Sequence, residues 1–152
     1  SNSSRSVCFL YGYGKKRLIG LCSYVWFSQL GFPHITLEFP YKRQSPLTKK
    51  VKTYDSIIQV WEEIEMLVDE WESSQFSLGR NLYFHLPLFM NPQWIIDIEY
   101  QMLLKEYNMI KEFNIPLANT IEEASARKLD EFDVISREIK SIQLYMDEKN
   151  GR

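Results

Sequence analysis

Chemically reactive side chains are scarce in this chain of 152 residues. It holds two histidines and two cysteines, and neither pair forms a known motif. A metal site needs His, Cys, Asp or Glu at ligand spacing, and nucleophilic catalysis needs a nucleophile beside a base. His34 and His85 lie on separate predicted strands, and Cys8 and Cys22 are not a CxxC pair. We therefore expect no metal, no cofactor, no catalytic residue and no small-molecule substrate, and we interpret the chain as a non-enzyme.

The low cysteine content and the lack of long apolar runs also bear on the compartment. A secreted disulfide framework requires more cysteines and a signal segment, and a membrane span requires about 20 apolar residues. The longest apolar run, residues 18–27, is too short for a span. Cys8 and Cys22 flank a predicted turn, so a disulfide is geometrically allowed, but two reduced, buried thiols are favoured. We expect a cytoplasmic, reducing compartment, or an intracellularly assembled particle, and no membrane contact.

Apolar patterning predicts strands in the first third of the chain. Residues 7–13, 18–27 and 35–41 are either largely apolar or alternate between apolar and polar side chains. Residues 82–89 also alternate, and this places Leu82, Phe84, Leu86 and Leu88 on one face of the predicted strand. Residues 12–16 resemble a phosphate-binding loop only superficially, because the GxxxxGK[ST] spacing is missing, and they are predicted as a basic turn. A short buried helix at residues 22–30 is also compatible, since a continuous apolar run has no distinguishing period.

Three helices are predicted in the remainder. The first starts near Thr53 or Asp55, the second at Asn91-Pro92, and the third at the capping box of residues 120–123, continuing to about Asp147. The second helix has apolar residues on two sides, which predicts that it is covered on both. The first of these sides comprises Ile95, Ile98, Met102 and Met109.

These elements predict an α+β fold with a small, mostly antiparallel sheet. The sheet combines strands from the N-terminal third with the strand near 82–89, and it packs against three helices, the last two long and antiparallel. We expect a single domain, 5–148, with a strand-rich part at 5–41, a basic connector at 42–52 and a mainly helical part at 53–148. Residues 1–4 and 149–152 are predicted to be disordered ends.

The last predicted helix has an apolar stripe at alternating steps of three and four residues. Such a stripe covers either the domain's own core or a partner. Because this helix is longer than a compact domain of this size requires, we predict that the stripe contributes to a protein interface. Its residues are Phe132, Ile135, Ile139, Ile142 and Met146.

The predicted helix after residue 52 has an acidic stripe opposite its apolar side. Carboxylates at helical spacing usually form a solvated face, but they can also bind a basic partner. We include this stripe in the predicted interface, with Glu62, Glu65, Asp69 and Glu72.

Charge is distributed very unevenly along the chain. Residues 1–52 hold nine bases and one acid, a net charge of +8, whereas residues 53–152 hold nine bases and 19 acids, a net charge of −10. The basic third either complements the acidic remainder, in the same chain or in a neighbouring copy, or binds nucleic acid with help from nearby aromatic rings. The eight bases predicted to contact nucleic acid are Lys15, Lys16, Arg17, Lys42, Arg43, Lys49, Lys50 and Lys52, and the ninth base of this segment is Arg5.

Together these features predict a non-catalytic assembly subunit of a larger complex, such as a virion or another multi-subunit particle. Aromatic residues make up 14% of the chain, and large rings suit interfaces. The partner would be another protein or further copies of this chain. The alternative is a nucleic-acid-binding module that uses the basic third. An enzyme would instead require a pocket in which His34, His85, Asp97 or Glu99 converge.

Overall fold

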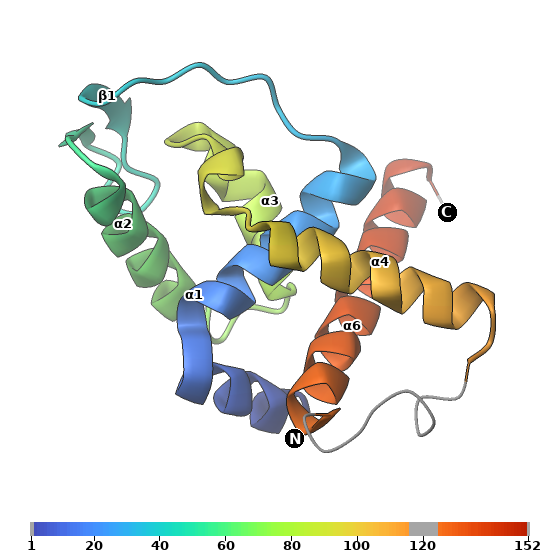
Figure 1. Cartoon of the computed structure of the whole chain (residues 1–152). Coiled ribbons are helices and arrows are strands. Elements are labelled where there is room, and N and C mark those ends of the chain that lie inside the picture. Colours follow the sequence, from blue (N-terminus) through green and yellow to red (C-terminus); the bar gives the residue numbers. More distant parts are fainter. Residues whose placement is uncertain (1, 116–124, 152) are drawn as a thin grey trace.

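The chain folds around a long helix near its start (Figure 1). The computed structural model describes the backbone of residues 2–115 and 125–151 and the side chains of residues 14–115 and 126–151. The elements are α1 (Asn2–Leu30), β1 (Tyr41–Gln44), β2 (Val51–Tyr54), α2 (Ile57–Glu70), α3 (Leu78–His85), η1 (Leu86–Leu88), η2 (Pro92–Ile95), α4 (Ile98–Glu112) and α6 (Ser125–Lys149). The predicted α+β class is confirmed, with a small antiparallel sheet packed on helices.

Helix α1 replaces the strands predicted for residues 7–13 and 18–27, so that prediction was wrong. Leu18, Ile19, Val25 and Trp26 are all at most 2% exposed, because α3 and α6 pack on this helix from different sides. A helix that is covered on all sides needs no polar face. Apolar and polar residues in its sequence therefore do not alternate with the helical period. The extended backbone of Gly14 (φ 178°, ψ 91°) divides the helix in two, where the basic turn was predicted.

The sheet consists of two strands that lie where a basic connector was predicted. Tyr41 pairs with Tyr54 and Gln44 with Val51 in an antiparallel register. Of the predicted strand at residues 35–41, only its last residue joins this sheet. The two tyrosine rings stack at 5.3 Å, and Tyr54 is fully buried, which fixes the hairpin to the helical body.

Residues 82–89 form the end of α3 and then η1, so the predicted strand there was also wrong. Leu82 and Leu86 are fully buried, whereas Phe84 and Leu88 are 40% and 57% exposed. Burial therefore recurs every four residues, as in a helix, although large apolar residues occupy every second position in the sequence, as in a strand.

The predicted helix at Asn91 is divided into two pieces. Asn91 caps η2 by accepting a hydrogen bond from the backbone N–H of Gln93, but Ile96 is extended, and Asp97 then caps α4. Helix α4 crosses α6 over a short stretch instead of running along it (Figure 1). The predicted capping box at residues 120–123 lies outside the described residues.

Within the described part of the chain, no helix combines the length and the apolar character that crossing a membrane requires.

Candidate functional site

The apolar stripe of α6 lies mostly inside the molecule. Phe132, Ile135 and Ile142 are buried, and Ile139 and Met146 are half-buried against the same core. The stripe therefore covers the chain's own core, which is one of the two interpretations that its spacing left open. It offers little free surface to a partner.

The acidic stripe of α2 remains at the surface. Glu62, Asp69 and Glu72 are exposed, and Glu65 is half-buried. The Asp69 carboxylate accepts a hydrogen bond of 2.8 Å from Lys15. Two apolar side chains stand out on the same helix, Ile58 at 68% exposed and Met66 at 44%.

The predicted nucleic-acid residues divide into two groups. Arg17 binds Glu99 at 2.5 Å and Glu131 at 2.6 Å, Lys15 binds Asp69, and Lys52 binds Glu63 at 3.4 Å. These bases complement the acidic remainder within the same chain. Lys16 lies 5.2 Å from the centre of the Trp61 ring. The second group lies exposed on the β1–β2 hairpin and consists of Lys42, Arg43, Lys49 and Lys50.

The residues that an enzyme would have to bring together lie in three separate parts of the described chain and have separate contacts. His34 is exposed in the segment after α1, whereas the His85 ring bonds the Asn81 carbonyl oxygen at 2.7 Å. Asp97 caps α4, and Glu99 pairs with Arg17. Among residues 14–115 and 126–151, no three His, Cys, Asp or Glu side chains are grouped to hold a metal ion.

Helix α4 and the residue after it carry four exposed apolar side chains on one face. Ile98 is 62% exposed, Met102 64%, Met109 47% and Phe113, directly after the helix, 65%. Successive residues are 100° apart around a helix, so these four lie within about 60° of one another. The sequence predicted this face but assigned it to the core, because apolar spacing cannot show which of two faces is covered. Tyr100, Leu103 and Leu104 form the side that is buried.

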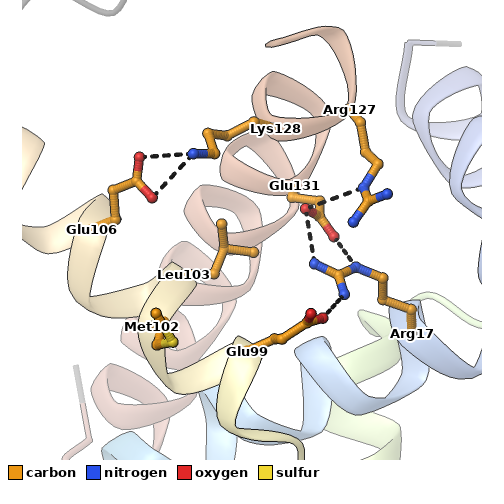
Figure 2. A pocket seen from close by; sticks show the side chains of 8 residues that line it. All are labelled: Arg17, Glu99, Met102, Leu103, Glu106, Arg127, Lys128 and Glu131. Carbon is orange, nitrogen blue, oxygen red and sulfur yellow. Dashed lines mark hydrogen bonds and ion pairs between the residues drawn. The ribbon is translucent and has the colours of Figure 1, made fainter. Parts of the chain in front are cut away.

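A groove of about 410 Å³ lies beside this face, between α1, α4 and α6 (Figure 2). Leu103 and Met102 are its apolar lining, and ion pairs stand on either side of them. Lys128 binds both carboxylate oxygens of Glu106, at 3.0 and 3.2 Å. On the other side Arg17 joins Glu99 to Glu131, and Arg127 lies 4.0 Å from Glu131. Each charged side chain drawn in Figure 2 faces one of opposite sign. The ion pairs that line the groove therefore mainly hold α4 against α1 and α6.

A buried carboxylate joins α1, α3 and α6 in the core. Glu138 accepts hydrogen bonds from Trp26 Nε1 at 2.8 Å and from the backbone N–H of Gly79 at 3.3 Å. Burial raises the pKa of this carboxyl, although hydrogen bonds from Ser77, Trp26, Gly79 and Cys22 act in the opposite direction. The Cys22 thiol is free and buried, and burial also raises its pKa. The side chain of Cys8 lies outside the described residues. We interpret this cluster as structural, because every polar group in it is directed at another helix of the core.

Comparison with protein-family models, curated proteins and solved structures found no significant match.

Proposed function

We propose that this chain is a non-catalytic assembly subunit and that α4 binds a second copy of the chain. The observation that carries the proposal is the exposed apolar face of α4, formed by Ile98, Met102, Met109 and Phe113. Apolar patches of this kind mark interaction sites on many proteins. Two of the four are methionines, whose unbranched side chains adapt readily to an opposing surface.

The spacing of these residues supports a second copy as the partner. The intervals between them are four, seven and four residues, so the pattern is the same in both directions along α4. Two copies of α4 packed antiparallel about a twofold axis would place Ile98 opposite Phe113 of the other copy and Met102 opposite Met109. A twofold interface uses the same surface on both copies, and this stripe is complementary to itself. Lys105 would lie near the axis.

The mass of the protein in solution tests the assembly. Met102→Glu would place a charge in the apolar seam, which costs about 3–5 kcal/mol and weakens association by about 100-fold or more. The matched control is Leu144→Glu on α6, because Met102 and Leu144 are both 64% exposed. Light scattering should give a dimer for the parent and the control and a monomer for Met102→Glu, with unchanged circular dichroism. A parent chain that stays monomeric at high concentration refutes the pairing.

Crosslinking through single cysteines tests the orientation, in a Cys8→Ser background that keeps the buried Cys22. Lys105→Cys should crosslink to itself, because it lies near the proposed axis. Ile98→Cys and Phe113→Cys should crosslink only when the two variants are mixed. Efficient crosslinking of Ile98→Cys with itself would show a parallel pairing and contradict the proposal.

The acidic face of α2 is a second contact within the same proposal. Its exposed carboxylates lie on the same helix as the exposed Ile58 and Met66, a combination that suits a partner with basic and apolar side chains. The expectation of a cytoplasmic, reducing compartment and of a larger particle also remains part of the proposal. The free thiol of Cys22 is compatible with a reducing compartment.

A further inference from the structure

The β1–β2 hairpin carries a dense positive charge that is independent of the α4 face. Residues 39–54 contain five bases and no acid, and the nearest carboxylates in sequence, Glu38 and Asp55, stand at the base of the hairpin. The hairpin lies at one end of the molecule, beside the start of α2 (Figure 1). Its bases are Lys42, Arg43, Lys49, Lys50 and Lys52.

A buried carboxylate holds the loop of this hairpin in place. Glu63 is 1% exposed and accepts a hydrogen bond of 2.5 Å from the hydroxyl of Ser45. The same hydroxyl oxygen accepts hydrogen bonds from the backbone N–H groups of Leu47 and Thr48. The backbone N–H of Lys49 donates to the Ser45 carbonyl oxygen at 2.8 Å. The loop lysines therefore project from a fixed support, which lowers the entropy cost of binding a ligand.

The pairing of the strands places two positively charged side chains next to each other, and only one of them has an acidic partner in the described structure. Arg43 is directly opposite Lys52, and like charges in this position destabilise a sheet. Lys52 has Glu63 at 3.4 Å, whereas the structure gives Arg43 no ion pair within the described residues. Lys49 also has a positive φ of 66°, which is uncommon for a residue other than glycine. A bound anion would offset the repulsion between Arg43 and Lys52.

The two faces of the hairpin differ in their side chains. Tyr41, Arg43, Lys52 and Tyr54 share one face, and the tyrosines pack against the body. The opposite face presents Lys42, Gln44, Val51 and Thr53, and Val51 is 70% exposed. It therefore carries a base, an amide, a hydroxyl and an apolar group, which are the groups that contact phosphates, base edges and thymine methyls.

We infer that this hairpin binds double-stranded DNA, with its outer face in the major groove and Lys42, Lys49 and Lys50 on the phosphates. Arg43 is exposed on the other face, and it would reach a fourth phosphate past the edge of its strand. The major groove of B-DNA is about 12 Å wide and admits a two-stranded ribbon. The major groove of an RNA duplex is too deep and narrow for side chains to read.

Other polyanions fit the hairpin less well. Single strands bind by stacking bases on free aromatic rings, but the rings here already pack against one another. Phe39 lies 4.9 Å from Trp94 and 5.4 Å from Tyr41, and Tyr41 lies on Tyr54. An anionic lipid surface is usually anchored by several apolar or aromatic groups, whereas the outer face has only Val51.

Fluorescence anisotropy with a short duplex DNA tests the inference. Four phosphate contacts predict a slope of about −3.6 for the logarithm of the association constant against the logarithm of the salt concentration, a loss of about 150-fold between 50 and 200 mM salt. The variant Lys49→Asn, Lys50→Gln should reduce the slope to about −1.8. Asparagine tolerates the positive φ at position 49, so the loop should fold as before.

The control variant is Lys140→Gln, Lys149→Gln on α6, which removes the same charge from two exposed positions. It should bind duplex DNA as the parent does. The inference is wrong if the parent does not bind duplex DNA at 50 mM salt or lower, or if both variants lose binding equally. Tighter binding to single-stranded DNA or to anionic vesicles would also overturn it. Should the loop variant lower the Tm, Lys42→Ala on the outer face should still weaken binding and reduce the slope by about 0.9.

Discussion

Replacing Gly79 by alanine should destabilise the protein, although helix propensity alone predicts the opposite. Gly79 lies in α3, where alanine is favoured by about 1 kcal/mol. However, a Cβ at this position would lie 2.3 Å from Trp26 Cδ1 and 2.4 Å from Glu138 Oε1. Trp26 is fully buried, with the rings of Tyr83 and Tyr145 within 6 Å of its own. The indole therefore has little room to move away.

The magnitude follows from two costs and one gain. Overpacking a core costs about 1–3 kcal/mol, and disturbing the hydrogen bond from Trp26 to the Glu138 carboxylate costs about 1.5–3 kcal/mol. After the propensity of alanine is subtracted, we expect a loss of about 1.5–5 kcal/mol in the free energy of unfolding. For a chain of this length the Tm should fall by about 3–20 °C.

Urea unfolding of the parent and of Gly79→Ala, followed by the near-ultraviolet dichroism of tryptophan, measures this loss directly. Asn108→Ala, at an exposed position of α4, is the control for helix propensity and should be neutral or stabilising by about 0.5 kcal/mol. An equal or higher free energy of unfolding for Gly79→Ala would refute the close approach of α3 to Trp26.

Two further predictions concern the buried carboxylates. Ser45→Ala should cost about 1–3 kcal/mol, because Glu63 then keeps only the longer hydrogen bond from Lys52. Amide exchange at Leu47 and Thr48 should accelerate, and unchanged exchange would contradict this. Burial raises the pKa of Glu138 above its unfolded value of about 4.3, so its contribution to stability is full below that pH and is lost as the pH rises through the folded pKa. The free energy of unfolding of the parent should therefore fall relative to that of Glu138→Gln as the pH rises above about 4, and a difference that does not depend on pH would argue against the raised pKa.

The sequence predicted the fold class better than the elements. Helices α2 and α6 each have one apolar side, so the helical spacing of their apolar residues can be recognised in the sequence. Residues 18–27 are covered on all sides, and their sequence could not distinguish a strand from a helix. The two strands of the hairpin were not predicted, because side chains such as Lys42, Arg43 and Lys52 are typical of a polar connector. Their pairing depends on the buried Tyr54 and on Glu63, 18 residues from Ser45 in sequence.

The candidate sites were predicted only in part for a related reason. Apolar spacing identified Ile98, Met102 and Met109 as one face of a helix, but only the packing of α4 shows that this face is open. Likewise the uneven charge was plain in the sequence, yet its partners depend on contacts between distant residues. Arg17 and Glu131 are 114 residues apart, and no local pattern links them.

The central position of α1 has a consequence for how the chain folds. The hydrogen bond between Trp26 and Glu138 spans 112 residues, so α1 cannot be covered by α6 until most of the described chain has been synthesised. At about 5–20 residues per second this takes roughly 5–20 seconds. During that time a helix with apolar groups on every side has only part of its native covering. The nascent chain should therefore need a chaperone, and slowing translation after α3 should increase aggregation.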